Sequence, residues 1–305
     1  MVTKLQNPPF DIFDVVIIGG AIIGSSVAWF LSNNDDFDGR ILVVERDPTY
    51  ERSSTTRTNS CMRQQFSSEL NIRISQFAAD FVRDFRGYMG GDPAVPDLHV
   101  HHFGYMYLAN NELSASRLRD SHAVQAACGA ATRLMSPEEI TAAYPFYQLD
   151  DIVLGSHNTV DEGYFDGSTM FDWWRRKALE KEVCYIANEV VDIGVDKGRV
   201  TDITLASGSI IKTGIVINAA GPRAASVAQM ARLTIPVEPR PRYTFVFAAA
   251  DPPDRAVPLT VDPSGVHFRT DGKYFMAGCS PLCDGPVDYD DLTMDHSLWQ
   301  EKAWP

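Results

Sequence analysis

The stretch that decides the fold of this 305-residue chain is Asp14-Val-Val-Ile-Ile-Gly-Gly-Ala-Ile-Ile-Gly-Ser-Ser-Val-Ala-Trp-Phe-Leu31. Four apolar β-branched residues lead directly into glycines, and the glycines lead into an amphipathic helical pattern. A strand, a glycine turn and a helix in this order are typical of the first βαβ unit of a dinucleotide-binding sheet. The stretch therefore predicts a dinucleotide site near the start of the chain.

The glycine turn matches the pattern G-x-G-x-x-G with one departure. Gly19 and Gly24 hold the first and third places, and Ala21 holds the second. A methyl group is tolerated at the second place if the backbone keeps φ negative and the methyl points away from the phosphates. Glu45 ends the next apolar run, where a carboxylate can accept hydrogen bonds from ribose hydroxyls and repels a 2′-phosphate.

Two other interpretations of the opening stretch stay open at this point. One is a buried apolar segment in which the glycines are incidental, because periodicity alone does not separate the two. The other is a membrane helix, which is less favoured because the apolar run is short and interrupted by glycine and serine pairs.

Composition and charge narrow the possible partners. The formal net charge is −13, which argues against nucleic acid and against anionic membranes. The five cysteines are odd in number and scattered, so a disulfide framework is not expected. The N-terminus lacks the apolar segment of a signal peptide, and no membrane span is expected. The default prediction is a cytoplasmic protein.

Later segments alternate between helical and extended patterns. Helices are predicted at 69–90 and 112–128, and a capping-box pattern opens another at Ser136. Extended patterns cover 183–195 and 210–218, and closely spaced strands follow from 237 to 277. Segments of α/β type thus flank a β-rich section, which suggests a dinucleotide domain interrupted by a covering sheet.

A second glycine site follows the strand pattern that ends at Asn218. Ala219, Ala220 and Gly221 are small, and Pro222 is a favoured first residue of a helix. Small residues at the carboxyl end of a strand let a ligand lie against the backbone, although a plain strand–loop–helix connection would look the same.

Taken together, these motifs resemble the FAD-dependent oxidoreductases of the D-amino-acid oxidase type, which include sarcosine and dimethylglycine oxidases. The resemblance rests on Ile18-Gly-Gly-Ala-Ile-Ile-Gly-Ser-Ser, Val43-Val-Glu-Arg-Asp-Pro, Arg63-Gln-Gln-Phe-Ser and Val216-Ile-Asn-Ala-Ala-Gly-Pro. It implies a Rossmann-like FAD-binding domain interleaved with a β-rich substrate domain that contains a mixed or antiparallel sheet. The implied FAD-binding domain comprises 1–98 and 157–235, and the substrate domain comprises 99–156 and 236–305.

The same resemblance implies FAD as the cofactor and assigns residues to it. At the pyrophosphate it places Gly19, Gly20, Ala21 and Gly24, and at the adenosine ribose it places Glu45 and Arg46. The loop residues that face the cofactor are Ser53, Thr55 and Thr56. The adenine meets the backbone of Val190, and along the cofactor lie Ala219, Ala220 and Gly221.

Four further residues are candidates for work on the substrate. Arg269 could clamp a carboxylate, although a surface charge is an equally good interpretation. His267 shares its strand face and is more simply structural, and Tyr243 could be either core or substrate-facing. Arg63 could stabilise reduced, anionic flavin. No metal is expected, because no carboxylate or cysteine completes a shell around His99, His101 and His102.

The resemblance implies oxidation of a C–N bond in an amino acid or N-methyl amine, by hydride transfer to flavin, with dioxygen or another electron acceptor. Two alternatives stay open. One is a non-catalytic FAD-binding factor, such as the complex I assembly factor that some family members resemble, or an inactive fragment. The other is an NAD-dependent dehydrogenase, which the second glycine site disfavours.

The end of the chain departs from the family pattern. Family members continue well beyond this point with a late glycine-rich segment that lies against the flavin, whereas this sequence ends at Trp299-Gln-Glu-Lys-Ala-Trp-Pro305. The expectation from the resemblance is a C-terminally truncated chain.

Overall fold

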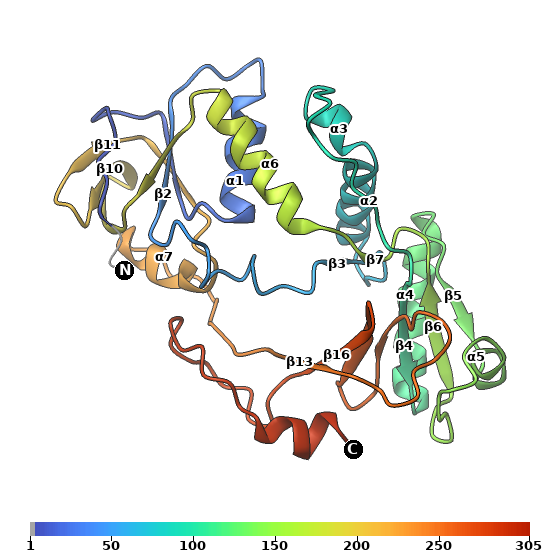
Figure 1. Ribbon diagram of the computed structural model, residues 1–305. Helices are drawn as coiled ribbons and strands as arrows, with labels where there is room; N and C mark the ends of the chain where they lie inside the picture. The colour runs from blue at the N-terminus through green and yellow to red at the C-terminus, as the bar shows by residue number, and fades with distance from the viewer. Residues whose placement is uncertain (1–3) are drawn as a thin grey trace. The chain divides into compact units, whose positions relative to one another are not determined.

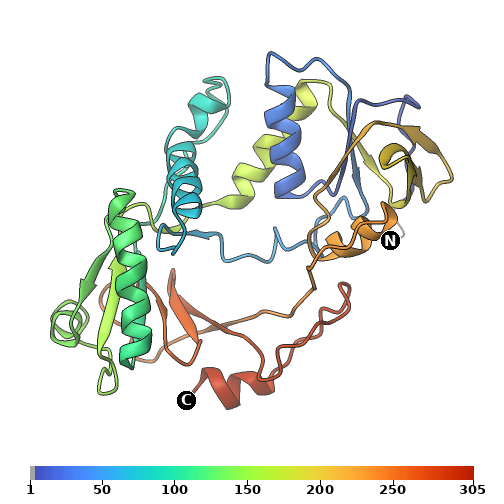
Figure 2. The same ribbon diagram turned by 180° about the vertical axis from the view of Figure 1, so that it is seen from behind.

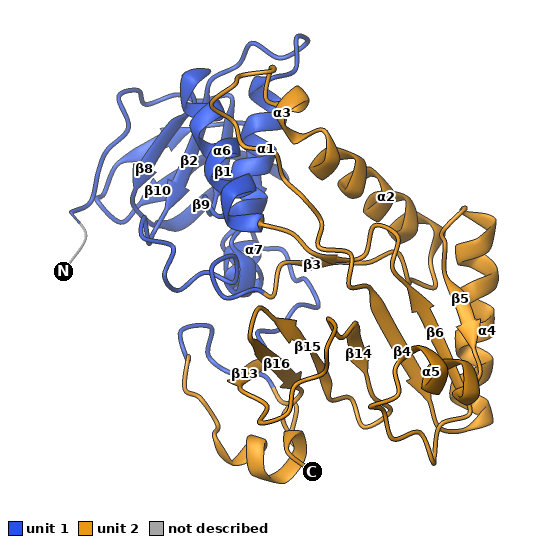
Figure 3. Cartoon of the chain, turned by 45° about the vertical axis from the view of Figure 1, so that its right-hand side comes forward, with its two compact units in different colours: residues 1–58, 167–240, 286–291 blue, residues 59–166, 241–285, 292–305 orange. Residues whose placement is uncertain are grey.

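The computed structural model describes residues 4–305, which form two compact units (Figure 3). Unit 1 comprises the chain up to Thr58 together with 167–240 and 286–291. Unit 2 comprises 59–166, 241–285 and 292–305. In the described part of the chain, no helix combines the length and the apolarity that crossing a membrane requires.

Unit 1 is built on a parallel sheet of four strands in the order β12, β1, β2, β8. These strands span Ile215–Asn218, Val15–Ile18, Ile41–Glu45 and Cys184–Ala187. Helices α1 (Ile22–Ser32) and α6 (Gly167–Glu180) lie side by side in both ribbon views (Figures 1 and 2). A short 3₁₀ turn (Gly221–Arg223) and helix α7 (Ala224–Met230) follow β12.

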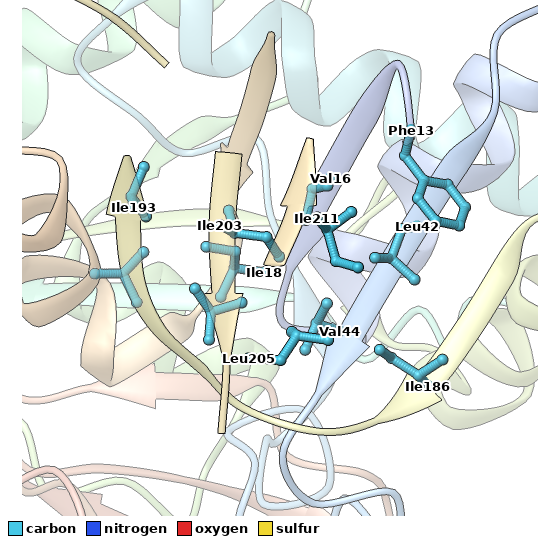
Figure 4. Packing of buried hydrophobic residues seen from close by; sticks show 12 residues of the cluster. Phe13, Val16, Ile18, Leu42, Val44, Ile186, Ile193, Ile203, Leu205 and Ile211 are labelled. Carbon is cyan, nitrogen blue, oxygen red and sulfur yellow. The ribbon is translucent and has the colours of Figure 1, made fainter. Parts of the chain in front are cut away.

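A second, antiparallel sheet in unit 1 packs against one face of the parallel sheet. It contains β9, β10 and β11, which span Val190–Asp196, Arg199–Leu205 and Ile210–Lys212. Strand alternation places Val16, Ile18 and Val44 on the face that meets Ile203 and Leu205, and all five side chains are buried (Figure 4). Because both faces of β1 and β2 are covered, these strands consist of continuous apolar runs rather than alternating ones.

Unit 2 is built on a seven-stranded sheet in the order β13, β16, β15, β14, β4, β6, β5 (Figure 3). These strands span Tyr243–Phe247, Tyr274–Cys279, His267–Asp271, Leu259–Val261, Tyr105–Ala109, Leu154–Asn158 and Arg133–Met135. The β14–β4 pair is parallel and every other pair is antiparallel, so the sheet is mixed. The predicted fold class is confirmed.

The remaining elements of unit 2 are short or helical. Strands β3 (Cys61–Met62) and β7 (Gly163–Tyr164) pair with each other. Helix α4 packs on β4, β5 and β6, and α5 packs on β5 and β6. The helices α2, α3, α4 and α5 and the terminal π-helical turn span Glu69–Arg83, Phe85–Tyr88, Glu112–Ala127, Pro137–Ala143 and Trp299–Ala303.

The division of the chain differs from the predicted domain boundaries. Residues 59–98, predicted to belong to the FAD-binding domain, lie in unit 2 because helix α2 packs beside α4. The side chain of Gln76 on α2 donates to the Cys128 carbonyl at the end of α4. Residues 157–166 also lie in unit 2, and 236–240 and 286–291 lie in unit 1, which differs from the predicted boundaries.

Three predicted strands are shorter or interrupted. The extended patterns at 183–195 and 210–218 each divide into two strands that belong to different sheets. Asn188 interrupts the first, where its side chain donates to the Gln6 carbonyl, and Thr213 interrupts the second, where its hydroxyl donates to the Asp14 carbonyl. The predicted strand from residue 237 begins only at Tyr243, because the prolines before it have no N–H group for a ladder.

Helix α5 has the capping box that the sequence predicted. The Ser136 hydroxyl accepts from the Glu139 N–H at 3.3 Å, and the Glu139 carboxylate accepts from the Ser136 N–H at 2.7 Å. We expect Ser136→Ala to lower the free energy of unfolding by about 1 kcal/mol, measured by urea denaturation. Ser116→Ala, at an exposed position inside α4, is the control and is expected to cost nothing. Equal losses in the two variants would show that the cap does not stabilise the protein.

Candidate functional site

The glycine turn of unit 1 requires its first and third glycines. Gly19 has φ +96°, and a Cβ at this position would lie 2.5 Å from the Ala219 carbonyl oxygen. A Cβ at Gly24 would lie 1.8 Å from the Gly19 carbonyl oxygen. The start of α1 therefore approaches the strand ends as closely as a backbone can, which leaves the surface of the turn free of side chains.

The N-terminus of α1 can accommodate an anion. Ala21 is the N-cap residue, with φ −70°, so its methyl group is compatible with the turn. Ala21 has no side-chain acceptor for the first-turn N–H groups, and the Ile22 N–H donates to the Thr55 hydroxyl at 3.2 Å. Because the N-cap side chain offers no acceptor, this helix start keeps first-turn N–H groups beyond Ile22, and the partial positive charge, that a pyrophosphate needs.

Glu45 lies beside this turn at the end of β2. Its carboxylate accepts from the N–H groups of Gly20 and Asp47, both at 2.8 Å. Burial raises the pKa of Glu45, and the hydrogen bonds from these two N–H groups oppose that increase. Each carboxylate oxygen keeps a second lone pair that could accept from a ribose hydroxyl.

The other predicted cofactor residues of unit 1 divide into three groups. The hydroxyls of Ser53 and Thr56 both donate to the Tyr50 carbonyl, so they hold their own loop. The Val190 side chain is buried in the core, which leaves only its backbone for a ligand. Ala219, Ala220 and Gly221 follow β12, whose last residue pairs in register with Ile18 of β1.

Arg46 faces a segment that sequence reasoning did not connect with it. Its guanidinium forms an ion pair with Asp290 and lies 5.8 Å from the ring centroid of Tyr289. Arg223 lies 4.8 Å from the same ring and pairs with Glu189 at 2.6 Å. The segment 286–291 thus holds two arginines that flank Glu45 and the second glycine site in sequence.

In unit 2, one row of paired residues crosses all seven strands of the sheet. The row is Thr244, Gly278, His267, Val261, Tyr107, Ser156 and Leu134. Directly paired residues point to the same side of a sheet, and so do residues two apart in one strand. Tyr105, Arg269 and Asn158 therefore share this side with the row, and we name it the site face.

Arg63 lies over the site face as a cation without a carboxylate partner. Its guanidinium carbon lies 4.5 Å from the ring centroid of Phe66 and 5.9 Å from those of Tyr105 and Tyr107. Its Nε is buried and has no hydrogen-bond partner in the described chain. Aromatic faces stabilise a guanidinium but leave its N–H groups free to bind an anion.

Arg269 has a carboxylate partner within unit 2. It is 4% exposed, and its Nη1 donates to the Thr270 carbonyl at 2.8 Å and to the Asp271 carboxylate at 2.9 Å. Its guanidinium also lies over the rings of Phe103 and Tyr164. The Nε of Arg269 is buried without a hydrogen-bond partner, as is that of Arg63, so the two arginines differ in that Asp271 balances the charge of Arg269 alone.

His267 and Tyr243 are not brought together. His267 lies on the site face, where a Cβ at Gly278 would be 2.6 Å from its Nε2, so the ring fills the space that this glycine leaves. Burial lowers the pKa of His267, which favours the neutral imidazole. Tyr243 pairs with Cys279 in the next row and points to the opposite side of the sheet. The structure thus separates Tyr243 from the other three substrate candidates.

Sequence reasoning did not identify the two tyrosines of β4 or the buried Glu162. Tyr105 and Tyr107 are two apart in a predicted strand, so alternation could have placed them on one face. Burial raises the pKa of each, which keeps both phenols protonated. Glu162 is 0% exposed, and burial raises its pKa to about 7. No periodic pattern marks it, because it lies in a loop.

The predicted absence of a metal site concerns His99, His101 and His102. Within residues 4–305, no three His, Cys, Asp or Glu side chains gather closely enough to hold a metal ion. The ring centroids of His101 and Tyr164 instead lie 5.7 Å apart, and the backbone N–H of His101 donates to the Tyr164 carbonyl.

Comparison with known proteins identifies relatives over the whole length of this arrangement. The family model described as "DAO: FAD dependent oxidoreductase" matches residues 14–301. "FAD-dependent oxidoreductase domain-containing protein 1" of Xenopus laevis is 33% identical over 338 residues, which cover 99% of this chain and 67% of that protein.

Two solved structures show the same fold at low identity. An L-proline dehydrogenase from P. horikoshii superposes with a TM-score of 0.78 at 23% identity, over 94% of this chain and 74% of the other. An L-amino acid deaminase from Proteus myxofaciens, solved in complex with anthranilate, superposes with a TM-score of 0.66 at 18% identity, over 91% and 60% of the two chains.

Proposed function

We propose, from the premise that this chain belongs to the D-amino-acid oxidase family of FAD-dependent oxidoreductases, that it oxidises a C–N bond of a carboxylated amine. The substrate class is an amino acid or an N-methyl amino acid. Family membership supports FAD and oxidoreductase chemistry, and the proposal adds the substrate class and the residue that recognises it.

The groups in unit 1 fit the ADP portion of FAD. Gly19 and Gly24 keep the turn clear, the N-cap residue of α1 has no side-chain acceptor, and Glu45 has lone pairs for ribose hydroxyls. The cofactor, when bound, supplies the hydride acceptor for the reaction. The protein's own part is to orient the substrate and to match its charges.

The observation that carries the proposal is the unpaired Arg63 on the site face. Arg269 is neutralised by Asp271, and burial keeps His267 neutral because it lowers the pKa of its imidazole. Arg63 is therefore the cation of this face whose charge no carboxylate of the described residues balances, which suits it to bind a substrate carboxylate. The rings of Tyr105 and Tyr107 form an aromatic wall beneath it. Dioxygen or another oxidant completes the proposed reaction as electron acceptor.

The test is anaerobic reduction of the FAD-loaded protein, and the loss of the visible flavin absorbance band measures that reduction. We expect at least one carboxylated amine among sarcosine, proline and D- and L-amino acids to reduce the flavin. The matching amine without a carboxylate should react roughly 100-fold more slowly, since a charge-assisted hydrogen bond contributes about 1.5–3 kcal/mol. Flavin that binds but is reduced by none of them, or equally by both kinds, would overturn the proposal and favour a non-catalytic role.

A further inference from the structure

A buried carboxylate lies among neutral donors next to the Arg63 segment. The Glu162 carboxylate accepts from the Gln64 N–H at 2.7 Å, the Gln65 Nε2 at 2.9 Å and the Asn158 Nδ2 at 3.0 Å. No cation pairs with it in the part of the chain that the structure describes. A fully buried carboxylate without a counter-ion costs several kcal/mol even when it is hydrogen-bonded, so a purely structural role would be better served by a neutral side chain.

The three donors connect Glu162 to the sheet under Arg63. Gln65 also donates to the Tyr105 carbonyl at 3.1 Å and accepts from the Ser156 hydroxyl at 2.8 Å. Gln64 and Gln65 directly follow Arg63 in sequence, and Tyr105 carries one of the rings under its guanidinium. Glu162, Gln65 and Ser156 thus form a buried clamp that joins the backbone after Arg63 to strands β4 and β6.

We propose that Glu162 is a positioning residue that holds the Arg63 guanidinium over Tyr105 and Tyr107 for binding a substrate carboxylate. The inference rests on the proposed function, since it assigns the clamp to the same arginine. Ionised Glu162 offers two acceptor oxygens to three donors. Protonation turns one oxygen into a donor that faces another donor, so the clamp loses a hydrogen bond and Arg63 loses its fixed place.

The clamp makes anion binding depend on pH in a defined direction. Burial raises the pKa of Glu162 to about 7, so the clamp is complete above that pH and weakened below it. Tyr107 of β4 interacts electrostatically with Glu162, and Tyr105 of the same strand is joined to it through Gln65. Tyr164 of β7 lies two residues after Glu162, pairs with Cys61 of β3 and has His101 beside it. Burial raises the pKa of Cys61 and of the three tyrosines, so they stay protonated at neutral pH. Burial lowers the pKa of His157, on the other side of β6, to about 4.

The experiment is calorimetric titration of the FAD-loaded full chain with anthranilate, an aromatic carboxylate, at about pH 6 and about pH 8. We expect the affinity of the wild-type chain to rise about tenfold between the two values. Glu162→Gln should bind about tenfold more weakly at the higher pH and show no pH dependence, because its amide N–H₂ faces the Gln65 donor. Ser156→Ala, which removes one clamp hydrogen bond with little change in volume, should bind anthranilate with intermediate affinity. If Glu162→Gln does not fold, the Ser156→Ala variant tests the clamp in its place.

Asp161→Asn is the matched control, because it removes one negative charge from the neighbouring residue without touching the clamp. Its left-handed φ of 54° is one that asparagine adopts readily. It should bind like the wild type. If Glu162→Gln instead binds more tightly, Glu162 acts only through its charge and the positioning role is wrong. If Arg63→Met leaves anthranilate binding unchanged, the proposed function fails. If Arg63→Met abolishes binding and Glu162→Gln does not alter it, only the present inference fails.

Discussion

A single added methyl group at position 24 should remove bound FAD and destabilise unit 1. In Gly24→Ala the new Cβ would lie 1.8 Å from the Gly19 carbonyl oxygen, which is backbone and cannot rotate away. Helix α1 must then move off the strand ends, which disrupts both its packing on Ile17 and the turn that faces the pyrophosphate. We expect a loss of about 3 kcal/mol or more in the free energy of unfolding, together with purification of a colourless protein.

Gly214→Ala is the matched control within the same unit. No heavy atom lies within 4 Å of the position where its Cβ would stand, and its φ is not left-handed. The substitution should retain FAD and change stability by less than about 1 kcal/mol, in either direction. Urea denaturation and the flavin absorbance of the purified protein measure both effects. A yellow Gly24→Ala protein with wild-type stability would contradict the close approach of helix and turn.

Loss of the Arg63 guanidinium should abolish carboxylate recognition while the fold persists. Arg63→Met keeps an unbranched apolar chain over Phe66, Tyr105 and Tyr107 but has no donors. Since the buried Nε of Arg63 has no hydrogen-bond partner among the described residues, its removal leaves no buried acceptor unsatisfied. We expect kcat/KM for a carboxylated amine to fall by roughly 100-fold to 1,000-fold, and thermal stability to change little.

Two further variants separate recognition from charge. Arg117→Met, on the exposed surface of α4, removes the same formal charge and should leave kcat/KM unchanged. Arg63→Lys keeps the charge but loses the planar pair of donors, so it should recover only part of the activity. If Arg63→Met and Arg117→Met have the same small effect, Arg63 does not bind the substrate.

Local signals in the sequence predicted much of unit 1 correctly. The glycine turn, the apolar run ending at Glu45 and the small residues after Asn218 each depend on short segments whose geometry is nearly independent of the rest of the chain. The capping box at Ser136 is similarly local. The predicted family, fold class and cofactor follow from these motifs, and the match over 14–301 confirms them.

Strand breaks and unit boundaries required the tertiary structure. The extended pattern at 210–218 is continuous in the sequence. In the structure, the Thr213 hydroxyl donates a hydrogen bond to the Asp14 carbonyl, and the segments before and after Thr213, β11 and β12, belong to different sheets. Helical spacing at 69–90 predicted one helix, whereas the structure has the two helices α2 and α3 on either side of Asp84. Leu70, Ile74 and Phe77 on α2 are at least half exposed. The pattern shows which residues share a face of a helix, but not which other element will cover that face.

The sequence by itself determined the dinucleotide half of this protein, because the turn, the helix start and Glu45 lie within a single local unit. Only the tertiary structure distinguished the candidate substrate-binding residues of unit 2 from one another. Arg63 and Arg269 are both arginines near aromatic residues in the sequence, and what distinguishes them is that Asp271 neutralises one while the other has only rings beside it. The choice between them depends on strand register and long-range packing, which bring together residues some 40 to 100 positions apart, such as Gln65 with Tyr105 and Glu162.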